Sequence, residues 1–137
     1  MRVLRTASTA AGLVLAAPPM ASAQPAAGLD CSRAVSTVEL TACAERDFAK
    51  ADRELNDAYR AALARIDGEA ANETHRRDWR LALQDAQRKW IAFRDADCKG
   101  PVALRFQGGT GASLAVSVCL LERTVARTGE LRRSGTD

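Results

Sequence analysis

The chain of 137 residues has the length of one domain, and two tryptophans and three phenylalanines give it few large core residues. Its formal net charge is +3, from 20 basic and 17 acidic residues. These charges are interleaved along the sequence, whereas a nucleic-acid-binding protein usually presents a basic stripe, so we do not expect nucleic acid as a partner.

The first 23 residues have the pattern of a secretory signal peptide. Arg2 and Arg5 give a basic start, an apolar run over residues 13–17 follows, and Ala21-Ser22-Ala23 matches the small-residue cleavage pattern. The apolar run is too short for a permanent membrane span, and no cysteine follows it directly as a lipoprotein anchor needs. We therefore expect Sec-type export with cleavage after Ala23. We expect the periplasmic or secreted product to have no membrane anchor, and its 18 basic and 17 acidic residues leave a net charge of about +1.

The mature chain begins with a leader and a helix start. Residues 24–30 show no periodicity, and we expect them to be flexible. Ser36 and Glu39 then have the spacing of a capping box, in which the serine oxygen accepts an early helical N–H and the glutamate reaches back. This pattern predicts a short N-terminal helix that runs through Cys43.

The central part predicts two long helices. From Phe48 to Ile66, apolar residues recur at steps of three and four, and Asp67-Gly68 is expected to close this helix with a left-handed glycine. The next helix begins around residue 72 and is expected to end before Gly100-Pro101. Its apolar stripe has the steadiest helical spacing in the chain: Trp79, Leu83, Ala86, Trp90 and Phe93.

The C-terminal part predicts a loop, a helix and a tail. Residues 99–111 form a glycine-containing loop, residues 114–131 have helical spacing, and residues 132–137 are expected to be a disordered tail. No segment alternates as a strand does. Short connections favour antiparallel neighbours. The predicted fold is therefore all-α: a small antiparallel bundle of three main helices plus the short N-terminal helix, with residues 31–131 as the domain.

Pairing the two central helices antiparallel makes a specific prediction about which residues face each other. A connection centred near residues 72–73 sets three pairs level: Asp52 with Arg94, Asn56 with Trp90, and Tyr59 with Gln87. These polar residues fall at the borders of the apolar stripes, so we expect a half-buried polar seam with Asp52–Arg94 as its ion pair. Such a seam more often fixes helix register than performs chemistry.

Four cysteines remain in the mature chain, at positions 31, 43, 98 and 119. An even number in a short exported chain indicates two disulfides. A zinc site is less expected because the cysteines are widely spaced and His75 is the only histidine. Of the three possible connectivities we favour Cys31–Cys43 and Cys98–Cys119, which close short loops and contribute on the order of 3 kcal/mol each.

Two motifs lie in the long helices. The first is D-x-x-L-N-x-x-Y, carried by Asp52, Leu55, Asn56 and Tyr59. The second is Q-x-x-W-x-x-x-R-D-x-x-C, carried by Gln87, Trp90, Arg94, Asp95 and Cys98. Between about residues 31 and 131 the chain resembles the lysozyme inhibitor LprI N-terminal-like family. The resemblance implies an exported helical domain with a protein partner, and lysozyme is the candidate because a mycobacterial lipoprotein of the family inhibits it.

We find no catalytic constellation in the sequence. Neither H-E-x-x-H nor G-x-S-x-G occurs, and Asp95 and Asp97 stand two apart, so they do not face each other on a helix. We expect no enzymatic activity, no cofactor and no metal.

A binding surface is instead expected on the loop between Cys98 and Cys119, which carries Lys99, Arg105, Phe106 and Gln107. We hypothesise that Arg105 and Phe106 form a contact tip, with a core position for Phe106 as the competing reading. The alternative function is a periplasmic scaffold or adaptor that binds an envelope component.

Overall fold

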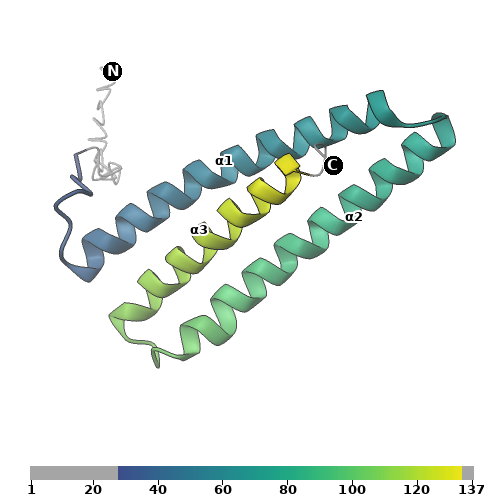
Figure 1. Cartoon of the computed structure of the whole chain (residues 1–137). Helices are drawn as coiled ribbons and strands as arrows, with labels where there is room; N and C mark the ends of the chain where they lie inside the picture. Colours follow the sequence, from purple (N-terminus) through teal and green to yellow (C-terminus); the bar gives the residue numbers. More distant parts are fainter. Residues whose placement is uncertain (1–27, 134–137) are drawn as a thin grey trace, which may run out of the picture.

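The computed structural model describes residues 28–133, which form three long α-helices joined by short connections (Figure 1). The elements are α1 (Thr37–Glu69), α2 (Glu73–Asp97), the short π-helix η1 (Cys98–Val102) and α3 (Thr110–Arg133). No strand occurs among these described residues, and the all-α prediction is confirmed. The expected signal peptide, most of the leader and residues 134–137 of the expected tail lie outside the described residues.

The three helices run up, down and up. α1 and α2 form an antiparallel hairpin, and α3 returns parallel to α1 (Figure 1). α3 packs most closely against α1, whereas α2 makes fewer close backbone approaches to either helix. Small residues on α1 explain the close approach, because Ala51, Ala58 and Ala62 are buried and keep the two backbones near each other. α2 is consequently held by longer side chains.

α1 begins as predicted but is longer than predicted. The Ser36 side chain accepts the Glu39 backbone N–H at 3.2 Å, and the Glu39 carboxylate accepts the Ser36 backbone N–H at 3.0 Å, which completes the capping box. A separate short N-terminal helix was a wrong prediction, because the helix continues through Cys43 without a break. Neither glycine nor proline occurs between Thr37 and Asp67 to interrupt it.

The turn between α1 and α2 also differs from its prediction. Gly68 does not adopt a left-handed conformation, and α1 ends one residue later, where Ala70 turns extended at φ −67° and ψ 131°. Asn72 then caps α2 by accepting the His75 backbone N–H on its side-chain oxygen at 2.9 Å. The hairpin is therefore closed by an extended residue and an asparagine cap.

The connection between α2 and α3 is only partly a loop. The chain does not leave the helix at Pro101, because η1 continues α2 through this residue. A turn follows in which Gln107 and Gly108 have positive φ angles of 49° and 75°. At the other end, α3 includes Arg132 and Arg133, which were expected to belong to the tail.

The core is centred on α1 and α3. Leu55, Ala58, Ala62 and Leu131 form its buried cluster, with Tyr59, Leu83 and Trp90 packed against it. The predicted stripe of α2 is only partly correct, because Phe93 is 55% exposed and Ala86 is exposed. The buried residues of α2 are polar: Gln87 and Arg94.

Candidate functional site

The centre of the bundle is organised around one arginine. Arg94 is 6% exposed, and its Nη1 donates to the Asp52 carboxylate of α1 at 3.2 Å and to the Thr124 hydroxyl of α3 at 3.1 Å. Its Nε donates to the neighbouring Asp95 at 2.9 Å. The predicted Asp52–Arg94 pair is confirmed, and it is part of a contact that joins all three helices.

Aromatic rings surround this arginine. The Arg94 guanidinium carbon lies 5.3 Å from the ring centroid of Phe48 and 5.3 Å from that of Trp90. Arg127 of α3 lies 5.9 Å from the same Trp90 ring and donates from Nε to the Gln87 side-chain oxygen at 3.2 Å. Cations over aromatic faces are attracted by the ring quadrupole, so these contacts help to hold α2 where apolar packing is sparse.

The remaining motif residues divide between the core and a groove. Leu55 is 1% exposed and belongs to the core. Asn56 is exposed and donates from Nδ2 to the Asp52 backbone carbonyl in its own helix at 2.9 Å. Asn56, Tyr59 and Gln87 line a groove of about 290 Å³ between α1 and α2, which we call the motif groove.

Asp95 stays ionised although it is partly buried. Burial alone raises the pKa of this carboxyl, but hydrogen bonds from Lys99 and Arg94 outweigh that effect, and its pKa lies below the ordinary value. Lys99 Nζ donates to the carboxylate at 2.9 Å. Asp95 therefore orients Arg94 on one side and holds Lys99 against the helix on the other.

Both predicted disulfides are confirmed. Cys31 pairs with Cys43 at a Cα–Cα distance of 5.8 Å, and Cys98 pairs with Cys119 at 5.7 Å. The first ties the segment before α1 to that helix, and the second ties the end of α2 to α3. Because α1 begins where α2 ends, both disulfides lie at the same end of the bundle (Figure 1).

The loop residues predicted to contact a partner lie at this disulfide-bonded end. Arg105 and Gln107 are exposed, and Phe106 is 46% exposed, so its ring is not a core residue. That ring lies over Gly111, where an added Cβ would come within 3.0 Å of Phe106 Cδ1. Leu104, which the sequence reasoning did not single out, is 76% exposed.

A groove beside this loop was also missed from the sequence. It has a volume of about 330 Å³ and lies between the first turns of α1 and α3. Val38, 76% exposed, and Thr110 line it from the two helices. We call it the disulfide-end groove. No sequence signal marks it, because it depends on how α3 is placed against α1.

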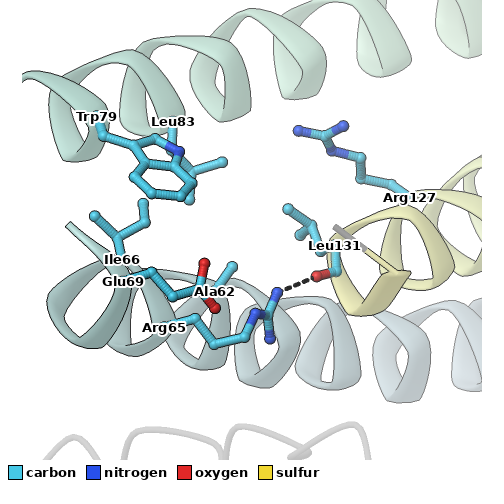
Figure 2. A pocket seen from close by; sticks show the side chains of 8 residues that line it. All are labelled: Ala62, Arg65, Ile66, Glu69, Trp79, Leu83, Arg127 and Leu131. Carbon is cyan, nitrogen blue, oxygen red and sulfur yellow. Dashed lines mark hydrogen bonds between the residues drawn. The ribbon is translucent and has the colours of Figure 1, made fainter. Parts of the chain in front are cut away.

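A third depression lies at the opposite end of the bundle, and we call it the hairpin-end pocket (Figure 2). Its volume is about 180 Å³. Its apolar lining comes from all three helices: Ala62, Ile66, Leu83 and Leu131. Trp79 forms a wall, and three charged side chains complete the lining: Arg65, Glu69 and Arg127.

One cluster has residue types that can bind a metal. Ligand atoms of Asp97, Cys98 and Cys119 lie within 4.8 Å of one another. Both sulfurs belong to the disulfide and are not thiolates, and the Asp97 carboxylate is paired with Arg123. The cluster therefore acts as a structural tie between α2 and α3. Within residues 28–133, no helix has the length and apolar character required to cross a membrane.

These features define a class of protein: a small all-α domain held by two disulfides, with a polar centre and surface depressions at both ends. The chain belongs to the lysozyme inhibitor LprI family, whose model matches residues 30–131. The family expected from the two helical motifs is thereby confirmed.

The chain is similar to several known proteins. An uncharacterised protein of Rhizobium meliloti (strain 1021) is 38% identical over 133 residues, which cover 94% of each chain. Lipoprotein LprI of Mycobacterium bovis and of Mycobacterium tuberculosis is 37% identical over 81 residues. That match covers 58% of this chain and 35% of the lipoprotein, so it spans about a third of the lipoprotein's length. No solved structure matches the chain.

Proposed function

We propose that this chain is an exported, non-catalytic protein-binding module that inhibits a lysozyme through its disulfide-bonded end. The observation that carries the proposal is the half-exposed Phe106 on a loop closed by the Cys98–Cys119 disulfide. Membership of a family described as lysozyme inhibitors supports the partner. The Mycobacterium relatives named as lipoproteins support an extracytoplasmic location.

The disulfide-bonded end combines exposed apolar groups with a rigid frame. Leu104 and Val38 are each 76% exposed, and Phe106 adds an aromatic ring of the kind enriched at interface centres. Because the disulfide limits the loop's motion before binding, less conformational entropy is lost when a partner docks. This end therefore has what a contact surface requires.

Arg105 supplies the charge that a lysozyme cleft recognises. Lysozymes cleave with two carboxyl groups in a cleft, so a protruding cation beside an apolar anchor fits that site. Arg105 is exposed and stands next to Phe106 on the tip. Lys99 contributes less, because its ammonium is already bound to Asp95 at 2.9 Å.

The direct test is inhibition of hen-type lysozyme by the purified mature chain. We expect inhibition that weakens by about tenfold in Arg105→Ala and in Phe106→Ala, since both change the centre of the interface. Arg53→Ala, at an exposed position on α1 away from the loop, is the matched control and should inhibit as the parent does. Inhibition that none of the three changes alters would exclude the loop as the contact surface.

A second candidate, an envelope scaffold or adaptor, is favoured by a different observation. α2 exposes apolar side chains outside the loop between Cys98 and Cys119: Leu81 at 56%, Ile91 at 39% and Phe93 at 55%. Absence of any effect on lysozyme, together with loss of an envelope partner in Ile91→Ser, would favour this function over inhibition.

A further inference from the structure

The hairpin-end pocket lies far from the disulfide-bonded end and has the composition of a small-ligand site. We propose that it binds one apolar group bearing a carboxylate, from either the C-terminal residue of a peptide or a free apolar acid. Ligand pockets are mostly apolar with a few polar groups that fix orientation, and this pocket has that composition.

The pocket lies where the described part of α3 stops short of the turn between α1 and α2. α3 ends at Arg133, while α1 and α2 continue toward their connecting turn (Figure 1). Among the described residues, the open space of the pocket lies between Trp79 on α2 and Leu131 on α3 (Figure 2).

The size of the pocket limits its occupant. Its volume of about 180 Å³ is close to that of an apolar cavity of about 150 Å³ that takes up one benzene, and smaller than the roughly 300 Å³ at which sites for drug-sized ligands begin. One ring or one branched side chain fits, and a sugar chain or a nucleotide does not.

The apolar lining is well fixed. Ile66 and Leu131 are 2% and 3% exposed, so they form a firm floor. Trp79, 36% exposed, presents its indole as a wall. His75 stacks on this indole with ring centroids 5.4 Å apart and an interplanar angle of 19°, which restrains its orientation. A ring or branched group that enters meets a preformed surface.

Two guanidinium groups border this apolar space on either side of Leu131 (Figure 2). Arg65 donates from Nη2 to the Leu131 backbone carbonyl at 2.6 Å. Arg127 donates to Gln87 and to Glu130, the latter at 2.8 Å. Each guanidinium has five N–H donors, so these bonds hold the two side chains and leave donors for a carboxylate.

Glu69 makes the pocket selective. Its carboxylate lines the pocket on the same helix as Arg65, and it opposes a second negative charge. A ligand with one carboxylate is therefore favoured over a dicarboxylate. For the same reason, Glu69→Gln should tighten the binding of a simple apolar acid.

The experiment is a ligand titration of the mature chain followed by the indole N–H resonances of its two tryptophans. The probes are N-acetylphenylalanine for a peptide C-terminus, 3-phenylpropionate for a free acid, and N-acetylphenylalaninamide as a control without the carboxylate. We expect the acids to shift the Trp79 signal more than the Trp90 signal, and the amide to bind at least about tenfold more weakly. Binding of N-acetylphenylalanine alone assigns the site to a peptide C-terminus, and binding of 3-phenylpropionate extends it to free acids.

Variants separate recognition from folding. Arg65→Gln and Arg127→Gln should each weaken the binding of the two acids by about tenfold. Arg60→Gln, on the exposed face of α1, should leave their binding unchanged. If either arginine change lowers stability, Glu69→Gln serves instead as a gain-of-binding variant, because Glu69 is exposed. Equal affinity for the acids and the amide, or no shift of Trp79 by any probe, would overturn the proposal. Lysozyme inhibition plays no part in these measurements.

Discussion

The guanidinium of Arg94 and the hydroxyl of Thr124 meet at 3.1 Å inside the bundle, where Thr124 is fully buried. This hydrogen bond joins α2 to α3 at a level where an apolar contact would be expected. The polar groups of this centre are all paired, because among the described residues no buried side-chain nitrogen or oxygen lacks a hydrogen-bond partner. A fully paired polar centre specifies one arrangement of the helices, since any other leaves a buried charge unpaired.

The first prediction concerns Arg94. Arg94→Ala removes the contacts to Asp52 and Thr124 and empties the space between Phe48 and Trp90. We expect the free energy of unfolding to fall by roughly 2–3 kcal/mol and the melting temperature to fall by on the order of 10 °C. Thermal unfolding followed by circular dichroism measures this. Arg53→Ala, on an exposed part of α1, should shift the midpoint little, and equal shifts would contradict the assigned role of Arg94.

Thr124→Val tests the hydroxyl separately from the arginine. Valine keeps the shape of threonine but cannot accept the Arg94 hydrogen bond, so the free energy of unfolding should fall by about 1–2 kcal/mol. In the Arg94→Ala background the same substitution should have a much smaller effect, because its partner is gone. Denaturant unfolding of the four proteins in this double-mutant cycle gives the coupling free energy. Additive losses would show that the two groups do not act together.

The contrast between Asp52 and Thr124 shows how far sequence reasoning reached. Asp52 was correctly paired with Arg94 because a short turn joins α1 to α2, and counting outward from it sets the register. Thr124 was not predicted, since α3 follows a longer connection that contains η1 and a turn. The antiparallel arrangement gives the direction of α3, but its register against α1 does not follow from counting. The hairpin-end pocket was missed for the same reason, because it depends on how α3 lies against α1 and α2.

Phe93 shows a second limit. Helical spacing marks an apolar face, but it does not say which part of that face a neighbour covers. α3 approaches α1 closely, and α2 turns Gln87 and Arg94 inward. Phe93 is left at the surface, where the guanidinium carbon of Arg123 lies 5.2 Å from its ring centroid. The four cysteines were easier to pair, because loop length alone favoured the observed connectivity.

A third prediction concerns the disulfides. They close segments with sequence separations of 12 and 21 residues, for which the chain-entropy model gives about 3 kcal/mol each. The double substitution Cys98→Ser and Cys119→Ser should lower stability by that amount and also weaken lysozyme inhibition, because it releases the loop that carries Phe106. The matched change at Cys31 and Cys43 should lower stability similarly but affect inhibition less. Unfolding curves and inhibition constants of both variants distinguish the two roles.

The capping box predicts a pH dependence. A hydrogen bond from the Ser36 backbone, followed by those from its hydroxyl and the Val35 backbone, holds the pKa of Glu39 below its ordinary value of 4.5. Since this pKa is lower in the folded chain, the stabilisation is present above the unfolded pKa and is lost as the pH falls through the folded pKa. Glu39→Gln should therefore flatten the decline in melting temperature between about pH 5 and pH 3. Glu122→Gln, an exposed change on α3, should leave that decline intact.

The position of the Phe106 ring can be tested without touching that residue. At Gly111, in the first turn of α3, an added Cβ would lie 3.0 Å from Phe106 Cδ1, so Gly111→Ala should push the ring aside by a few tenths of an ångström. Alanine is a better helix former than glycine by up to about 1 kcal/mol, so the melting temperature should hold or rise. If the observed ring position forms the contact, inhibition should nonetheless weaken, and by less than in Phe106→Ala, which removes the ring.

Gly100→Ala is the matched control for this substitution. Gly100 lies in η1 on the same connection, and no atom lies within 4 Å of where its Cβ would be, so the ring should stay in place. Ring resonances of Phe106 should shift in Gly111→Ala and remain unchanged in Gly100→Ala. If the ring moves in the first variant while both variants inhibit equally, the contact does not depend on where Phe106 lies. A binding surface would then have to be sought on the exposed face of α2, where Ile91 is 39% exposed.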